Sequence, residues 1–518
     1  MRLTALLSIA LALISTPLCS MAQTSGRFTL QEKQGPNAVG LKVVEQYDYS
    51  RTFQPTIDAM GKPYPGERAR PLQTLIWYPA KKSDAKLMTF GDYVALQATE
   101  TSFDNPKDLT GMEAMFIASM KPVFQQPMWA TRDAALASGK FPVIIYAPSF
   151  SSVSWENVDL CEYLASYGYV VIAAPGMGVT RESTHDVAGT NAQAQDISFL
   201  IGFARTLPDT DLSEVGVVGF SWGGIANLFA SARDNRIDAL VALDGSMRYF
   251  PGVVKDAGDV HPDQMTIPLL YFKGQESLED EAHLHDRFKS DGPNVLNEWT
   301  HGDLVSVQML GLFHPEFSSK AQRNELLWKY EASGLQEADY DRQDGVIGYA
   351  WMARYTREFL DAYLKHNGPA LQFLKNKPSD NAVPKHVLAV NFQPAKSMPA
   401  SFTSLRVEAA RQGFDHVADI YAAMQKDQPD FKVDADDVVS WAYDLLADSH
   451  FPEAIDVMKL GVQINPSSRA YSSLGEMYAK AGQKQAAIDS YKTALEKDPN
   501  NVIATVGLEE IGSGPSEK

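Results

Sequence analysis

The chain has 518 residues, of which 45% are hydrophobic and 10% aromatic, enough apolar material for a large packed core. These values exclude a disordered chain, and the length indicates more than one domain. The formal net charge of -18 and the lack of a Lys/Arg cluster argue against a nucleic-acid-binding protein, because phosphate contacts need a basic surface.

Residues 1–22 have the pattern of a signal peptide. Arg2 is followed by a mostly apolar run to Leu18, and small residues precede a cleavage point before Gln23. The run of about 16 residues is short for a membrane span, which needs roughly 20. We therefore expect export to the periplasm or out of the cell, with no membrane span after cleavage and with Cys161 as a lone thiol.

Residues 23–390 are predicted to form one α/β domain. Its first two extended stretches, 41–49 and 71–78, are separated by a connection rich in Pro and Gly and would open the sheet as antiparallel strands. Between residues 88 and 138, Met and aromatic residues at partly helical spacing predict a helical insertion. This insertion either packs on the core or forms a lid or acyl-binding wall.

Strands and helices alternate in the next part of the chain. Strands are predicted over 143–146, 169–174, 215–218, 239–243 and 268–272, and helices near 155–166, 192–205 and 223–232. Such alternation predicts a mostly parallel sheet with helices on both faces, and a helix through Lys365 would close the domain.

The strand over 215–218 runs into Gly219-Phe220-Ser221-Trp222-Gly223, and a helix follows directly. A Gly-x-Ser-x-Gly turn between a strand and a helix holds the serine hydroxyl exposed, as in a nucleophile elbow. Ser221 is therefore the candidate nucleophile. A serine hydroxyl also needs a histidine to take its proton and a carboxylate to orient that histidine.

Candidates for both partners follow Ser221. Asp244 ends the strand over 239–243, whereas the competing acids come after the next strand, and position alone does not separate the two choices. The competing acids are Glu276, Glu279 and Asp280. We assign His301, in a predicted loop late in the domain, as the base, with His314 as the alternative. The histidines show no metal-ligand spacing, so we expect neither a metal nor a cofactor.

Residues 391–400, with Pro394 and Pro399, are predicted to be a linker to a small all-α domain over 401–510. This region resembles tetratricopeptide repeats, in which small residues let two helices approach and Pro ends the second. The matching residues are Tyr471, Leu474, Gly475, Tyr478, Ala487, Tyr491, Ala494 and Pro499. Ala454 and Pro466 repeat the pattern about 33 residues earlier, and 402–424 would be a degenerate third repeat or a cap.

The region from about Gly40 to Leu374 resembles the platelet-activating-factor acetylhydrolase branch of the α/β-hydrolases. The features that carry the resemblance, in chain order, are Arg70-Pro71-Leu72 leading into Trp77-Tyr78-Pro79, then Leu164-Ala165-Ser166-Tyr167-Gly168-Tyr169, then the elbow. The resemblance implies Asp244 as the acid, because the interval from Ser221 is similar to that of the family, and His301 follows at a similar distance.

The resemblance also implies an oxyanion hole made by the backbone N–H groups of Trp222 and Phe150, which would stabilise the tetrahedral intermediate. Here the chain departs from the family, since Pro148-Ser149 stands where His-Gly is usual.

These features predict an exported serine hydrolase that cleaves a small-molecule or lipid-like carboxylic ester through an acyl-enzyme intermediate. The same triad would also suit a peptidase or amidase. A third interpretation is a scaffold whose repeats bind a protein partner while the hydrolase fold is inactive.

Overall fold

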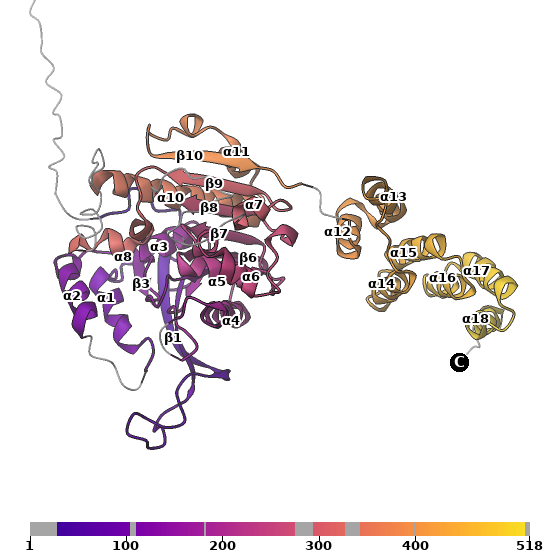
Figure 1. Ribbon diagram of the computed structural model, residues 1–518, viewed down its shortest axis with the longest axis horizontal. Helices are drawn as coiled ribbons and strands as arrows, with labels where there is room; N and C mark the ends of the chain where they lie inside the picture. The colour runs from indigo at the N-terminus through magenta and orange to yellow at the C-terminus, as the bar shows by residue number, and fades with distance from the viewer. Residues whose placement is uncertain are drawn as a thin grey trace, which may run out of the picture. The chain divides into compact units, whose positions relative to one another are not determined.

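A computed structural model describes residues 28–103, 110–180, 183–274, 294–326, 342–396 and 400–512 of the chain. The predicted signal peptide, residues 1–22, lies outside these ranges. The chain divides into two compact units, Met1–Lys396 and Ser397–Lys518 (Figure 1). None of the helices in the described ranges is long and apolar enough to cross a membrane.

The first unit is built on one sheet, which has ten strands within the described residues in the order β10-β9-β8-β7-β6-β4-β5-β2-β1-β3. The six neighbouring strands from β9 to β5 run parallel, whereas β2 and β10 join this block antiparallel. The strands are β1 (Ala38–Thr52), β2 (Ala69–Ala80), β3 (Ala130–Arg132), β4 (Phe141–Ala147), β5 (Val170–Ala173), β6 (Thr210–Phe220), β7 (Ala239–Leu243), β8 (Leu269–Lys273), β9 (Leu304–Met309) and β10 (Leu388–Gln393). The predicted mostly parallel sheet is confirmed.

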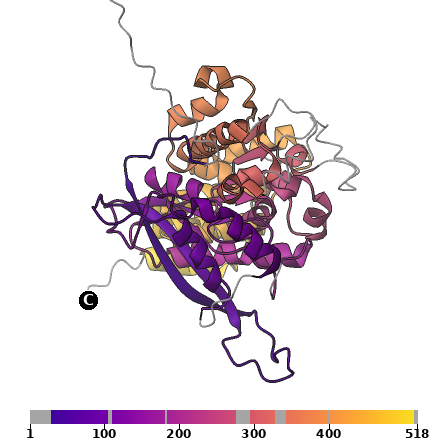
Figure 2. The same cartoon turned by 90° about the vertical axis from the view of Figure 1, so that its left-hand side faces the viewer.

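The predicted antiparallel opening of the sheet is also confirmed. β1 and β2 pair in register from Ala38 opposite Ala80 to Asp48 opposite Arg70. Their connecting segment projects beyond the body of the sheet in Figure 2. β1 and β2 are longer than the sequence predicts, because pairing extends both strands past their most apolar residues.

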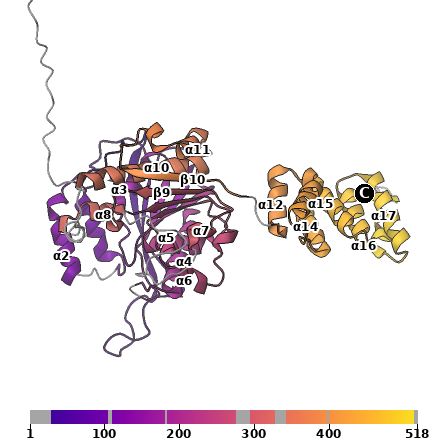
Figure 3. The same ribbon diagram turned by 45° about the horizontal axis from the view of Figure 1, so that its top comes forward.

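Helices cover both faces of the sheet, as Figure 3 shows, with α3 and α10 on one face and α4 and α5 on the other. The helices of this unit are α1 (Phe90–Ala95), α2 (Gly111–Met120), α3 (Val158–Ser166), α4 (Val187–Ala204), α5 (Trp222–Ser231), α6 (Pro251–Asp256), α7 (Val295–Glu298), α8 (Ser319–Gln322), α10 (Arg342–Leu364) and α11 (Gly368–Lys375). α10 corresponds to the helix that was predicted to close the domain, and it ends at Leu364, one residue before the predicted end at Lys365.

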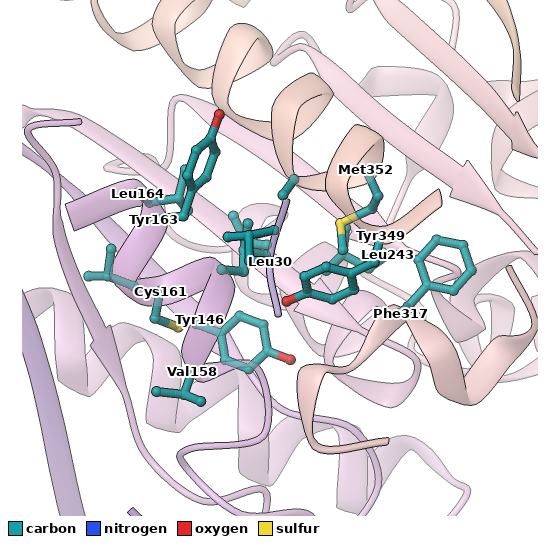
Figure 4. Close-up of a cluster of buried hydrophobic side chains, with 14 of the residues drawn as sticks. Leu30, Tyr146, Val158, Cys161, Tyr163, Leu164, Leu243, Phe317, Tyr349 and Met352 are labelled. Carbon is teal, nitrogen blue, oxygen red and sulfur yellow. The ribbon is translucent and has the colours of Figure 1, made fainter. Parts of the chain in front are cut away.

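The central strands are apolar on both sides because both faces are covered. In β4, Ile144 and Tyr146 join the core under α3 and α10, whereas Val143 and Ile145 join the core under α4 and α5. This alternation follows from the two-residue period of a strand. Figure 4 shows part of the first core, where Cys161 of α3 lies in the same cluster as Tyr349 and Met352 of α10.

The predicted insertion over 88–138 is helical only in its first part. α1 and α2 are each followed by a 3-10 turn, and β3 then pairs parallel with β1 at Val39–Leu41. The last part of the insertion is therefore an edge of the sheet. Met120 and Met128 are buried in the core, whereas Met115 is 48% exposed.

Within its described residues, 400–512, the second unit has helices and no strand. The helices are α12 (Phe402–Gln412), α13 (Val417–Asp427), α14 (Ala435–Ala447), α15 (Phe451–Ile464), α16 (Ser468–Lys480), α17 (Lys484–Lys497) and α18 (Val502–Gly512). A Cβ atom at Gly475 would lie 2.6 Å from the ring of Tyr491, so α16 and α17 approach closely only because this position has no side chain. Ala454 and Ala487, the matching small residues of α15 and α17, are fully buried.

The predicted linker over 391–400 begins too early. Residues 391–393 complete β10, which pairs with β9 from Leu388 opposite Met309 to Gln393 opposite Leu304. The strand stops at Pro394, which has no N–H to continue the ladder. The compact units separate between Lys396 and Ser397.

Candidate active site

The elbow that the sequence predicts is present at the end of β6. Ser221 has φ 53° and ψ -118°, a left-handed conformation that costs a non-glycine residue energy and persists only where the surroundings enforce it. A Cβ atom at Gly223 would lie 2.1 Å from the carbonyl oxygen of Ala147, and one at Gly219 would lie 2.4 Å from the carbonyl oxygen of Gly223. Both glycines are therefore required for the turn to close.

The backbone of Ser221 is tied to the loop that follows β7. Its N–H donates to the carbonyl of Leu243 at 3.1 Å, and its carbonyl accepts from Ser246 at 2.8 Å and from Gly224 at 2.9 Å. These bonds fix the elbow against the residues on both sides of Asp244. The backbone segments that carry the nucleophile and the candidate acid are therefore hydrogen-bonded to each other.

Asp244 is held at the carboxyl end of β7 with its side chain 1% exposed. One carboxylate oxygen accepts from the Tyr249 hydroxyl at 2.8 Å and from the Gly274 N–H at 3.1 Å, and the other lies 2.6 Å from Nδ1 of His314. Burial alone would raise the pKa of Asp244, but the hydrogen bonds and charge of His314, with those from Tyr249 and Gly274, hold it below the usual value. The carboxylate is therefore ionised at neutral pH.

His314 completes the chain of contacts. Its Nε2 atom lies 2.9 Å from the Ser221 hydroxyl, while its Nδ1 atom faces Asp244. His314 opens a short 3-10 turn, His314–Phe317, after the carboxyl end of β9, and its ring lies 5.1 Å from that of Phe220. Ser221, His314 and Asp244 thus have the hydrogen-bonding order in which a base takes the serine proton and a carboxylate orients the base.

The assignment of His301 as the base was wrong, because the structure brings His314 to Ser221 in its place. His301 precedes β9, and β9 runs parallel to β8, with Leu304 opposite Leu269. Residues before a parallel strand lie at the amino edge of the sheet, whereas Ser221, Asp244 and His314 all follow their strands at the carboxyl edge. The competing acids Glu276, Glu279 and Asp280 lie outside the described residues.

Of the two residues predicted to supply oxyanion donors, Trp222 belongs to the elbow and Phe150 to the loop after β4. Trp222 is the first residue of α5, and the N–H groups of a helical first turn have no acceptor within the helix. Phe150 lies just after β4, and its ring centroid is 6.0 Å from that of Trp222. Trp222 thus follows the nucleophile directly and Phe150 packs against Trp222, and their role as donors stays a prediction.

Aromatic side chains cluster around Trp222. The His185 ring stacks on Phe150 with centroids 4.0 Å apart and lies parallel to Phe250 at 5.8 Å. Trp222 meets this stack edge-on, at 4.8 Å from His185. Sequence reasoning did not single out His185 or Phe250, because neither belongs to a motif and they come together only through the fold.

Comparison with known proteins agrees with this architecture. Residues 129–277 match the Dienelactone hydrolase family, and residues 468–501 match the Tetratricopeptide repeat. A protein of Synechocystis sp., provisionally named as a carboxymethylenebutenolidase, is 31% identical over 157 residues, which cover 27% of this chain and 63% of the relative. An uncharacterized protein of Pseudomonas aeruginosa is 29% identical over 106 residues, covering 20% of this chain and 28% of the relative.

Among solved structures, a ferulic acid esterase from Streptomyces cinnamoneus aligns with a TM-score of 0.49 and 19% identity, covering 70% of this chain and 98% of the esterase. The chain spans less than two thirds of the length of both curated relatives. The first unit is an α/β-hydrolase-like domain. The second unit is a helical region that contains a tetratricopeptide repeat.

Proposed function

We propose that the protein is an exported serine hydrolase that cleaves carboxylic esters, with Ser221 as nucleophile, His314 as base and Asp244 as orienting acid. One observation carries the proposal: the imidazole of His314 lies 2.9 Å from the Ser221 hydroxyl and 2.6 Å from the Asp244 carboxylate. A serine that only closes a turn has no need of a histidine and a buried carboxylate in this order.

In the proposed reaction, His314 Nε2 takes the proton of Ser221 as its oxygen attacks the ester carbonyl. Asp244 keeps Nδ1 protonated and stabilises the imidazolium that forms. The N–H groups of Trp222 and Phe150 would donate to the carbonyl oxygen as it becomes negative. His314 then protonates the departing alcohol, and a water molecule activated by the same imidazole releases the acid from Ser221.

Small-molecule and lipid-like esters are the proposed substrates. The name of the Synechocystis relative denotes a butenolide, which is a cyclic ester, and this adds lactones to the substrates that deserve testing. The finer resemblance to the platelet-activating-factor acetylhydrolase branch stays a prediction. The tetratricopeptide repeat is proposed to bind a protein partner, since such repeats present surfaces for protein contacts.

The test uses the chain from Gln23 onward with 4-nitrophenyl esters, a lactone and a matched 4-nitroanilide. We expect ester turnover in the wild type, covalent labelling of Ser221 by a fluorophosphonate, and loss of both in Ser221→Ala. Ester turnover that survives in Ser221→Ala would contradict the proposal. Faster turnover of the anilide would make the protein an amidase instead.

A further inference from the structure

The loop that carries Phe150 is held by a buried carboxylate that the proposed mechanism does not use. Glu156 is 3% exposed, and one of its oxygens accepts from the Ser149 N–H at 2.8 Å and from the Tyr146 hydroxyl at 3.1 Å. Its other oxygen accepts from the Ser149 hydroxyl. Glu156 therefore fixes both the backbone and the side chain of the residue directly before Phe150.

Other contacts hold the same loop from its remaining sides. The side chain of Gln193 donates to the Pro148 carbonyl at 2.8 Å, and the hydroxyl of Ser151 accepts from the Ser183 N–H at 2.8 Å. Ser151 has φ 50°, which a serine keeps only where neighbours enforce it. The Ser149 carbonyl, which belongs to the same peptide as the Phe150 N–H, accepts from the Ser152 N–H at 3.1 Å. Glu156 thus supplies the side-chain contacts to Ser149, the residue that carries this peptide.

The turn that contains Glu156 also holds the segment that follows His314. The carbonyl of Glu156 accepts from the Lys320 N–H at 3.0 Å. The Asn157 side chain donates to the Phe317 carbonyl at 2.9 Å and accepts from the Ser319 N–H at 3.0 Å. Phe317 ends the short turn that His314 opens. The backbone around Glu156 is therefore hydrogen-bonded to the segment that follows His314, whereas the Glu156 side chain contacts the loop that carries Phe150.

We propose that Glu156 is a positioning residue for catalysis: by holding Ser149 it aims the Phe150 N–H at the oxygen that becomes negative in the transition state. This inference rests on the proposed hydrolase function. An acidic acceptor suits the task because hydrogen bonds to a charged group are stronger than those between neutral groups.

The test compares variants at Glu156 with a matched control at Glu162. Glu162 is also buried and also has three donors: the Tyr93 hydroxyl at 2.7 Å and the N–H groups of Trp129 at 2.7 Å and Ala130 at 3.1 Å, where Glu156 has two hydroxyls and one N–H. Its partners are not part of the loop over 148–152. Glu156→Leu and Glu162→Leu thus leave similar donors unpaired, and only the first disturbs the oxyanion loop.

For each variant, fluorophosphonate labelling counts competent sites, and kcat, KM and the Ki of a trifluoromethyl ketone are measured. The ketone forms a tetrahedral adduct, so its Ki reports the oxyanion hole. We expect Glu156→Leu to lower kcat and raise Ki by about 10²-fold, the usual effect of losing one oxyanion donor, with KM changed by less than about threefold. Glu156→Gln should restore kcat to within about fivefold of the wild type, because its amide oxygen still accepts from Ser149.

Glu162→Leu should keep kcat per labelled site within about threefold of the wild type. The inference is overturned if Glu156→Leu also keeps kcat per labelled site within about threefold of the wild type, or if the two variants lower kcat by the same factor. Should Glu156→Leu not fold, Glu156→Asp replaces it, and a kcat reduced by about tenfold is expected when the acceptor withdraws by one methylene. Unchanged kcat in that variant overturns the inference. A wild type without turnover or labelling would contradict the proposed function itself, which is a different outcome.

Discussion

Replacement of His314 by alanine tests the central geometry of the site most directly. The imidazole lies 2.9 Å from the Ser221 hydroxyl, so His314→Ala removes the only base within hydrogen-bonding distance of that hydroxyl among the described side chains. Loss of a triad histidine lowers kcat by about 10⁴-fold to 10⁶-fold, which corresponds to about 5 to 8 kcal/mol of transition-state stabilisation at roughly 1.4 kcal/mol per tenfold.

The fold should survive this change. The His314 side chain is 42% exposed, and Asp244 keeps its hydrogen bonds from Tyr249 and Gly274. We expect the free energy of unfolding to fall by about 1.5 to 3 kcal/mol, the cost of one lost hydrogen bond to a charged group. Urea unfolding followed by circular dichroism measures this term separately from kcat.

His301→Ala is the matched control. Because His301 lies before β9, at the amino edge of the sheet, its removal should change kcat for a 4-nitrophenyl ester by less than about threefold. If His301→Ala lost activity by more than about 10³-fold while His314→Ala kept it, the geometric argument for His314 would be refuted.

Three further predictions concern the acid of the site, two buried carboxyl groups and the packing of the repeat helices. Asp244→Asn should lower kcat by about 10³-fold to 10⁴-fold with ester KM little changed, because an amide favours the wrong imidazole tautomer; a steady-state assay that finds a tenfold loss or less would contradict the proposed role. Burial raises the pKa of Glu100 and of Glu162 to about 7, above the ordinary value of 4.5, despite opposing hydrogen bonds from Ser154 and Tyr93 respectively. The folded state therefore holds extra protons between these pH values, and its free energy of unfolding should fall as pH rises through that window, by up to about 3 kcal/mol per group. Urea unfolding at pH values from 5 to 8 should show that the free energy of unfolding falls less steeply with pH in Glu100→Gln than in the wild type. The same dependence on pH in both proteins would contradict a raised pKa for Glu100. In the helical unit, Gly475→Val should cost about 1 to 3 kcal/mol, since a Cβ atom there meets the Tyr491 ring at 2.6 Å, whereas esterase activity per labelled site should not change.

Local patterns in the sequence were sufficient for most of the first unit. The apolar strands around the elbow are short, continuous and bounded by turn residues, so their positions and the parallel sheet could be predicted. The small residues of the repeats likewise predicted the helical second unit, because close helix packing leaves a regular pattern in the sequence.

The error in the base came from one unrecognised strand. β9, Leu304–Met309, is not among the predicted strands, because it carries Ser306 and Gln308 between its apolar residues and directly follows the predicted loop that contains His301. Once β9 is placed, His301 falls before it and His314 after it. The alternation of Val305, Val307 and Met309 with Ser306 and Gln308 was the available signal.

β3 and β10 show the same limit in another form. β3 has three residues, and β10 overlaps the stretch that its prolines indicated as a linker. Each becomes a strand only because a neighbouring edge, β1 or β9, offers unpaired backbone groups. Short edge strands depend on such long-range pairing more than on their own residues.

The sequence alone determined the identity of the nucleophile candidate, because the elbow is a local structure whose glycines and serine are consecutive. The tertiary structure decided which histidine reaches Ser221, and it showed that Glu156 holds the neighbouring loop. Both depend on which edge of the sheet a residue occupies and on contacts between segments far apart in the chain. The pairing of the strands decides which residues lie close together, and the spacing of residues along the chain does not predict it.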